Sequence, residues 1–341
     1  DFIICDHHNP GKQVPSATAV LDPKQPDCDY PYKELSGCGV GFKLLQAFCI
    51  KNHIPFKDLN QYLDLVVVSI ASDIVPLTGE NRILAHYGLK KINTKPSDGL
   101  KAILEFSGIE NKNITINDIV FKIGPRINAA GRMASGKDAV DLLVSENIKK
   151  TINLAESINK NNTIRKDFDQ SITEEALALI SSDTQLIDRK TTVLFNPNWH
   201  KGVVGIVASR LIEHYYRPTV VLTEANGMAT GSARSVEGFD LYRAVEKCSD
   251  LLENFGGHMY ADGLTLKIEN VSLFSKKFEK IVSETIHPDL LKPKIEIDAN
   301  LKLEEITPRF FKILRQFEPF GPENMTPVFV SKNVKDWGYG K

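Results

Sequence analysis

The stretch Phe2-Ile3-Ile4-Cys5-Asp6-His7-His8 decides the fold of the first part of this chain. Its apolar half, Phe2 to Cys5, predicts a short strand, and an acidic side chain and two imidazoles follow it directly. In parallel α/β sheets, binding sites gather at the carboxyl ends of strands. We therefore expect Asp6, His7 and His8 to belong to a functional site.

A second apolar run, Leu65 to Ile70, is continuous and rich in β-branched residues, which predicts a buried parallel strand. It leads into Asp73, and Pro76 stops it. Helices are predicted over residues 36–50, 78–91 and 97–107. Strands that alternate with helices indicate a doubly wound α/β layer. Asp73 would then lie at a strand end near the histidines, where such side chains suit Mn²⁺ or Mg²⁺.

Residues 138–182 predict one long helix, because apolar residues recur every three to four positions without an interrupting Pro or Gly. A helix of about 40 residues extends about 60 Å, which indicates a bridge between two domains. The alternative is a pair of packed helices broken at Asn161-Asn162.

A second α/β unit is predicted over residues 183–288. Its strands are expected at 192–195, 219–223, 228–235 and 264–268, and its helices at 203–216 and from Asp240. Beyond it, a strand at 295–298, a helix at 308–316 and a strand at 328–330 indicate part of a third domain. The fold class is therefore α/β: two doubly wound domains (1–137 and 183–288), a long connecting helix (138–182) and an incomplete β domain (289–341).

Composition places few limits on function. The 341 residues are 42% hydrophobic and 25% charged, as in ordinary soluble proteins, and we expect neither a membrane span nor a signal peptide. Five cysteines without a CxxC pair indicate reduced thiols and a cytoplasmic location. The first residue is not Met and the first strand begins at once, so we expect a fragment that lacks its N-terminus.

The net charge of −1 excludes a globally basic nucleic-acid binder. Residues 82–137 nevertheless hold ten Lys/Arg against four Asp/Glu, a local excess of +6. This segment is either a solvated face or a track for phosphates.

Further motifs stand along the chain. They are Ala71 to Pro76, Gly124-Pro125-Arg126-Ile127-Asn128-Ala129-Ala130-Gly131-Arg132, Trp199 to Leu211, Ser232-Ala233-Arg234-Ser235 and Gly256-Gly257-His258. Together with Asp6-His7-His8 they resemble the DHH phosphoesterase superfamily, and within it the RecJ-type single-strand-specific 5′→3′ exonucleases. The likeness runs over nearly the whole chain, and it implies a DHHA1-like second unit and an OB-like third domain.

The resemblance implies hydrolysis of phosphodiesters by two divalent cations, Mn²⁺ or Mg²⁺. His7 and Asp73 would be metal ligands, Asp6 would orient an imidazole, and His8 would touch the scissile phosphate. One His and one Asp cannot hold two cations. The resemblance places the remaining ligands before residue 1, so we expect this chain alone to have little or no nuclease activity.

Three groups of residues are candidates for binding the substrate. Arg126 and Arg132, with Asn128 in a small-residue turn between them, either grip phosphates or are ordinary surface arginines. Ser232 and Arg234 share a strand face by alternation and suit a second phosphate. The segment Gly256-Gly257-His258 forms either a nest of N–H groups for an anion or a plain turn. His200 faces the same groove or has a packing or capping role.

Two other functions stay open. One is a phosphodiesterase of the same superfamily that acts on small molecules or oligoribonucleotides, and the other is a metal-free replication scaffold. Residues 318–324 resemble the start of the OB-type domain of the exonucleases, which favours single-stranded DNA. A role in DNA repair and recombination, with a single-strand-binding protein and a helicase as partners, follows from the resemblance alone.

Overall fold

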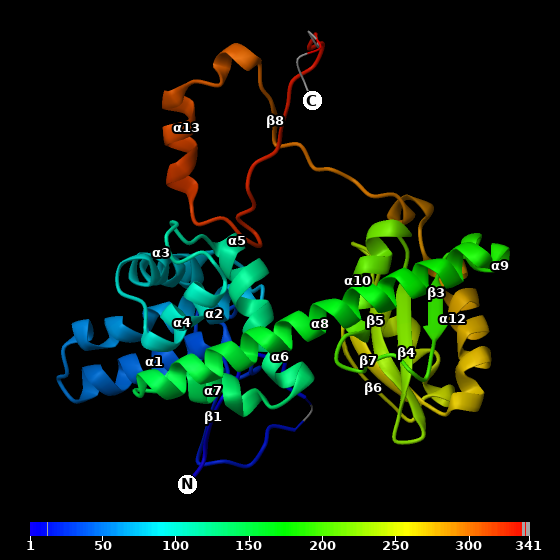
Figure 1. Ribbon diagram of the computed structural model, residues 1–341, viewed down its shortest axis with the longest axis horizontal. Helices are drawn as coiled ribbons and strands as arrows, with labels where there is room; N and C mark the ends of the chain where they lie inside the picture. The colour runs from blue at the N-terminus through cyan, green and yellow to red at the C-terminus, as the bar shows by residue number, and fades with distance from the viewer. Residues whose placement is uncertain (12, 336–337, 339–341) are drawn as a thin grey trace. The chain divides into compact units, whose positions relative to one another are not determined.

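The computed structural model describes residues 1–11, 13–335 and 338 (Figure 1). It divides into two compact units, of which the first comprises Asp1–Lys160 with Glu296–Lys341 and the second comprises Asn161–Ile295. Within the described ranges, none of the helices combines the length and the hydropathy that a membrane crossing requires.

The first unit begins with the predicted strand, β1 (Ile3–Cys5), which pairs in parallel with β2 (Ala19–Leu21). Helices then follow: α1 (Gly37–Lys51), α2 (Leu63–Ser72), α3 (Gly79–Thr94), α4 (Asp98–Phe106), α5 (Ile116–Asp118), α6 (Gly124–Met133) and α7 (Gly136–Val144). The predicted helices over 36–50, 78–91 and 97–107 are thus confirmed as α1, α3 and α4. Ser36 is the N-cap of α1, because its Oγ accepts a hydrogen bond from the N–H of Gly39 at 3.2 Å.

The second predicted strand, Leu65 to Ile70, is wrong: these residues lie in helix α2. Val66, Val67 and Ile70 are fully buried, so this helix is apolar on nearly every side and shows no helical period. Gly88 of α3 permits close packing on α2, since a Cβ there would lie 2.5 Å from the carbonyl oxygen of Leu63. The layer at this position is helix on helix.

The long predicted helix over 138–182 is wrong at its start. The chain forms α7 and, after a break at residues 145–147, the 35-residue helix α8 (Ile148–Ser182). The break is stabilised by Ser145 Oγ, which accepts from the N–H of Asn147, and by Asn147 Oδ1, which accepts from the N–H of Lys150. The chain remains helical at Asn162, whose buried Oδ1 accepts from Arg165 Nε at 3.3 Å.

The second unit holds one mixed five-stranded sheet of order β3-β4-β5-β7-β6. The strands are β3 (Thr192–Phe195), β4 (Thr219–Ala225), β5 (Met228–Arg234), β6 (Asn254–His258) and β7 (Ala261–Leu266). Only the β3–β4 pair is parallel within this sheet, so the predicted doubly wound pattern holds for that pair alone. The hairpin turn at Asn226-Gly227, where both residues have positive φ, makes β5 antiparallel to β4.

Helices cover both faces of this sheet, which confirms the α/β class (Figure 1). On one face, α8 and α10 (Val204–His214) bury a core that includes Ile172, Val207 and Val221. On the other, α11 (Leu241–Glu246) and α12 (Val271–Thr285) pack on Val220 and Leu222.

The C-terminal segment adds α13 (Pro308–Leu314) and a short parallel pair, β8 (Ala299–Asn300) with β9 (Phe329–Val330). The predicted helix and the last strand are confirmed, whereas residues 295–298 have no regular structure and the strand begins after them. This segment belongs to the first unit. The backbone N–H of Leu77 donates to the carbonyl oxygen of Pro322 at 2.7 Å, and Arg82 Nη2 donates to that of Phe317 at 3.0 Å.

Candidate metal centre and phosphate contacts

The centre of the candidate site is a direct contact between the first two motifs. His7 Nε2 lies 2.9 Å from Asp73 Oδ2, although 66 positions separate the residues. His7 follows strand β1, and its side chain is only 13% exposed. Asp73 is the C-cap of α2, where its N–H donates to the carbonyl oxygen of Ser69. The sequence-based expectation that these two side chains meet is therefore confirmed.

Asp6 fixes the second imidazole of the motif. Its Oδ1 accepts from the backbone N–H of His7 at 2.7 Å and of His8 at 3.2 Å, and lies 2.7 Å from His8 Nδ1. The hydrogen bond from His8, aided by the two backbone bonds, outweighs partial burial and lowers the pKa of Asp6 to about 2. An ionised Asp6 holds the proton of His8 on Nδ1, which leaves Nε2 to face solvent.

The geometry of the His7–Asp73 pair fits a divalent cation. Two ligand atoms at neighbouring positions of an octahedral Mg²⁺ site, each about 2.1 Å from the ion, lie about 3 Å apart. The observed separation of 2.9 Å matches that value. In the part of the chain that the structure describes, no group of three or more His, Cys, Asp or Glu side chains gathers for a metal. His7 Nε2 and Asp73 Oδ2 thus lie at a separation that two ligands of one cation could have.

The motif Gly124 to Arg132 is helix α6 rather than the predicted turn. Its small residues serve packing: Ala129 and Ala130 are fully buried. A Cβ on Gly124 would lie 2.8 Å from Ser72 Oγ, so this glycine lets α6 approach the residue next to Asp73.

The two arginines of α6 point in different directions and do not contact one phosphate together. They are six positions apart, which places them about 120° apart around a helix. Arg126 is half-buried, donating through Nη1 to the carbonyl oxygen of Lys122 at 2.7 Å and through Nε to Asn159 Oδ1 at 3.0 Å, and burial lowers its pKa. Asn128 and Arg132 are exposed.

In the second unit, Ser232 and Arg234 share one face of β5, as predicted, and Arg234 Nη1 donates to Ser232 Oγ. Both lie at the beginning of α10. A Cβ on Gly205 would come within 3.0 Å of Arg234 Nη2 and 3.2 Å of Ser232 Oγ. A guanidinium, a hydroxyl and the N-terminal end of an 11-residue helix therefore converge.

The motif Gly256-Gly257-His258 forms strand β6, which corrects both readings of it as a turn or a nest. A Cβ on Gly257 would lie 2.2 Å from the carbonyl oxygen of Ala261, so the strand pairing requires a glycine. The N–H of Gly256 is not available to an anion because it donates to Asp262 Oδ1 at 2.9 Å. His258 is exposed, and its Nδ1 accepts from the N–H of Tyr260 at 3.4 Å.

His200 packs against a neighbouring ring and caps a backbone N–H, as one of the two interpretations of its sequence position predicted. Its ring stacks on Phe168, with centroids 5.1 Å apart and planes at 23°. Its Nδ1 accepts from the N–H of Gly202 at 3.1 Å.

Comparison with known proteins places this arrangement in a family. Residues 1–70 match the model of the DHH family N-terminal domain, residues 188–284 that of the DHHA1 domain, and residues 297–338 that of the RecJ OB domain. A crystal structure of exonuclease RecJ bound to manganese is 30% identical with a TM-score of 0.67, over 84% of this chain and 70% of that one. The chain belongs to the RecJ family. The fold class, with its OB-type C-terminal domain, is thereby confirmed.

Other relatives extend the same likeness. The single-stranded-DNA-specific exonucleases RecJ of Bacillus subtilis and Escherichia coli are 37% and 35% identical over 98% and 96% of this chain. The chain spans 42% and 60% of their respective lengths. RecJ of Thermus thermophilus in complex with Mn²⁺ gives a TM-score of 0.84 at 28% identity, over 99% of this chain and 50% of that one.

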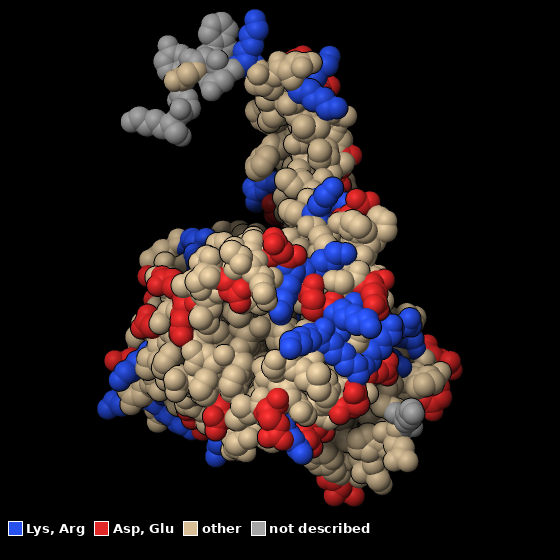
Figure 2. Space-filling view, turned by 90° about the vertical axis from the view of Figure 1, so that its right-hand side faces the viewer, with Lys and Arg blue, Asp and Glu red and all other residues tan. Residues whose placement is uncertain are grey.

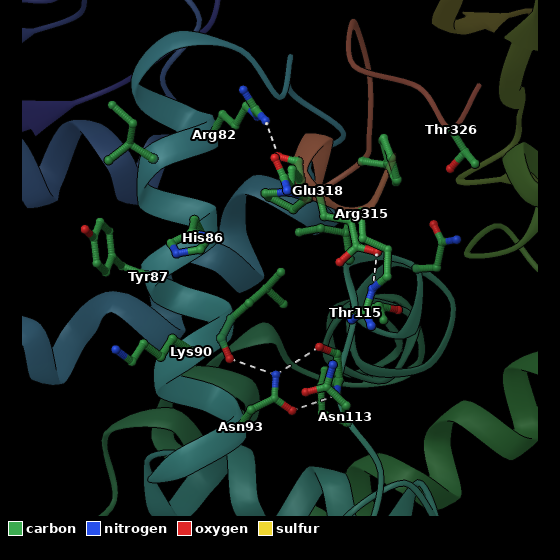
Figure 3. Close-up of a pocket in the computed structure, with 18 of the residues that line it drawn as sticks. Arg82, His86, Tyr87, Lys90, Asn93, Asn113, Thr115, Arg315, Glu318 and Thr326 are labelled. Atoms are coloured by element: carbon green, nitrogen blue, oxygen red, sulfur yellow. Dashed lines mark hydrogen bonds and ion pairs between the residues drawn. The ribbon is translucent and has the colours of Figure 1, made fainter. Parts of the chain in front are cut away.

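A cleft of about 1180 Å³ lies within the first unit of this RecJ-family chain (Figure 3). Helix α3, residues 113–117 and the OB-type segment line it, and no residue predicted for the site does so. Its cationic side chains include Arg82, Lys90 and Arg315, of which Arg315 Nε lies 3.4 Å from Glu318 Oε1. The cleft is therefore separate from the His7–Asp73 pair.

Two polar residues of this RecJ-family chain were missed by sequence reasoning. Asp262 is 2% exposed in the second unit, and Asn81 is fully buried in the first. Burial raises the pKa of Asp262, although backbone hydrogen bonds from Gly256 and Gly263 oppose it. Neither residue stands in a chemical motif, and no pattern in the sequence singles them out.

Proposed function

We propose that this chain carries part of a metal-dependent exonuclease that degrades single-stranded DNA in the 5′→3′ direction. The observation that carries the proposal is the 2.9 Å contact between His7 and Asp73, at a separation that suits two ligands of one cation. The relatives named as single-stranded-DNA-specific exonucleases, and the neighbours solved with Mg²⁺ and Mn²⁺, support the substrate and the cofactor. The polarity rests on family resemblance alone.

In this proposal His7 Nε2 and Asp73 Oδ2 hold the cation. A bound Mn²⁺ or Mg²⁺ supplies positive charge against the phosphate oxygens and makes nearby water more acidic. Asp6 contacts Nδ1 of His8 and so fixes the orientation of the ring, whose other nitrogen, Nε2, would face the scissile phosphate. Asp6 thus serves the reaction through the orientation of His8.

Phosphate contacts come from both units. In the second unit, Arg234, Ser232 and the beginning of α10 form the site for a further phosphate, which we assign to the 5′ end of the strand. In the first, Arg132 and Asn128 are exposed on α6, beside the helix that carries Asp73, while Arg126 braces α6. Contacts of this kind bind the backbone and carry no base preference.

The charge distribution on the surface supports binding of phosphates at a limited basic area, and does not support binding over the whole surface. Figure 2 shows acidic and basic side chains interspersed over one face, with Lys and Arg gathered in one area of it. The cationic cleft beside the OB-type segment offers another stretch for a single strand, since OB folds bind single strands. Binding should therefore weaken steeply with salt.

The test uses the chain of 341 residues. Electron paramagnetic resonance measures how much added Mn²⁺ is bound, and fluorescence anisotropy compares a long single strand with a duplex of equal length. Fluorescence anisotropy also compares the affinity for the long strand with that for a labelled dinucleotide, a comparison that does not require hydrolysis. We expect the wild type to bind one Mn²⁺ and the His7→Gln variant to bind none. We also expect the chain to bind the single strand more tightly than the duplex. Absence of Mn²⁺ binding would indicate a scaffold, and preference for the dinucleotide a small-molecule phosphodiesterase.

The ligand count also limits activity. One His and one Asp are too few for two cations, so we expect this chain alone to hydrolyse DNA slowly or not at all. We further propose a role in DNA repair and recombination in the cytoplasm, with a single-strand-binding protein and a helicase as partners. The five free cysteines support the location, and resemblance alone supports the partners.

A further inference from the structure

Asn81 occupies an unusual place in the first unit. It lies on helix α3 with no exposed surface, and its Nδ2 donates to two backbone carbonyl oxygens, those of Glu34 and of Pro76. The Pro76 bond measures 2.9 Å. The amide oxygen, Oδ1, is buried without a hydrogen-bond partner among the described residues. Burying Oδ1 without a partner costs stability, and the two hydrogen bonds that Nδ2 donates offset that cost.

The two carbonyls belong to the segments that carry or contact the candidate ligands. Glu34 lies two residues before Ser36, the N-cap of α1, and the next residue, Gly37, faces His7: a Cβ on Gly37 would lie 3.5 Å from His7 Cδ2. Pro76 lies in the loop that runs from Asp73 to Thr78, the N-cap of α3. The side-chain amide of Asn81 therefore ties the segment before α1, which lies beside His7, to the loop after Asp73.

That loop needs an external restraint. Ile74 follows Asp73 with φ of +55°, a conformation that is strained for a β-branched residue and persists only where surroundings enforce it. The hydroxyl of Tyr32 assists, being 2.9 Å from the carbonyl oxygen of Thr78 and 3.2 Å from that of Pro76. Tyr32 lies two residues before Glu34, so its hydroxyl also joins the segment before α1 to this loop, and Asn81 adds a second tie between the same segments from helix α3.

We infer that Asn81 is a positioning residue that sets the separation of His7 Nε2 and Asp73 Oδ2. Its significance for a metal rests on the proposed function, but the claim about the separation does not. Asn93, which is exposed, provides a control on the same helix with the same pattern of two carbonyl partners. Its Nδ2 donates to the carbonyl oxygens of Leu89 and Ile114 at 2.8 and 3.0 Å, and thus also ties α3 to another segment, but not to the site.

The first measurement uses metal-free protein labelled with ¹⁵N-histidine, at one pH. Substitution Asp73→Asn should shift the ring nitrogen signals of His7 in the wild-type and Asn93→Leu backgrounds. In the Asn81→Leu background that shift should fall at least twofold, because the contact is already lost. An equal shift in all three backgrounds overturns the inference. If circular dichroism shows that Asn81→Leu does not fold, Asn81→Ser, which cannot span both carbonyls, takes its place in the same comparison.

The second measurement is the dissociation constant for Mn²⁺, read by electron paramagnetic resonance. Loss of a residue that orients ligands weakens a metal about 10- to 100-fold, so we expect a rise of about tenfold for Asn81→Leu and none for Asn93→Leu. Unchanged Mn²⁺ affinity in a folded Asn81 variant overturns the positioning role. If the wild type binds no Mn²⁺, the proposed function fails, and the histidine signals still decide the role of Asn81.

Discussion

Arg210 of α10 holds Asp169 of α8 through two hydrogen bonds, each 2.8 Å long, from Nε to Oδ1 and from Nη2 to Oδ2. Asp169 is 1% exposed, and Arg165 Nη1 lies 3.6 Å from the same carboxylate. A buried carboxylate in a bidentate pair fixes the position of one helix on the other. This pair therefore holds α10, whose first turn borders Ser232 and Arg234, on α8.

Removal of Arg210 should destabilise the second unit. Arg210→Met leaves the buried charge of Asp169 with only the more distant Arg165, and we expect a loss of about 2 kcal/mol, reduced because Arg210 is half exposed. Urea unfolding monitored by circular dichroism measures it. The triple variant Arg165→Met/Asp169→Leu/Arg210→Met, which leaves no unpaired buried charge, should recover most of the loss. A triple variant less stable than Arg210→Met would contradict this explanation.

The proposed metal site makes a second prediction. Asp73→Asn removes one of the two proposed ligands, so the dissociation constant for Mn²⁺ should rise at least about tenfold. Isothermal titration measures it. Asp58→Asn, an exposed change in the same unit, should leave the constant unaltered. Equal affinity in the two variants would place the cation elsewhere.

A third prediction concerns the phosphate site that we propose at Ser232 and Arg234. Arg234→Ala should weaken single-strand binding by a similar factor for every base sequence, and should reduce the slope of log affinity against log salt by about 1. Fluorescence anisotropy at several salt concentrations measures both. The control is Arg243→Ala on α11, which removes a cation whose side chain is 79% exposed. A loss of affinity confined to some sequences would show that Arg234 reads bases.

The buried acid of the second unit makes a prediction about pH. Burial raises the pKa of Asp262 in the folded chain above its unfolded value, so the folded state binds the proton more tightly. The stability that this proton provides is complete below the unfolded pKa and is lost as pH rises through the folded pKa. Asp262→Asn, which keeps an acceptor for Gly256, should thus raise the free energy of unfolding at pH 7 relative to wild type. The gain should vanish near pH 3, and a gain independent of pH would contradict this origin.

The sequence predicted the meeting of His7 and Asp73 through a partly wrong route. It assumed two neighbouring strand ends, but Asp73 ends a buried helix. A run such as Leu65 to Ile70 is apolar throughout in either structure, so periodicity cannot separate the two. The functional motifs located the site because their chemistry does not depend on which element presents them.

Other errors share a physical cause. Small residues were read as turns in α6 and β6, where they permit close packing instead: Gly124 against Ser72, and Gly257 against Ala261. Such contacts join segments far apart in the chain. Asn81 was missed for the same reason, since its partners are backbone atoms that carry no sequence signal.

The hydrogen bond from the N–H of Leu77 to the carbonyl oxygen of Pro322 bears on how the protein can be engineered. It attaches the C-terminal segment four residues after Asp73. A chimera that exchanged this segment for that of a relative, with a junction near residue 296, would remake a backbone bond close to the His7–Asp73 pair. The C-terminal segment can therefore be replaced by that of a relative only if the relative supplies a carbonyl oxygen in place of that of Pro322.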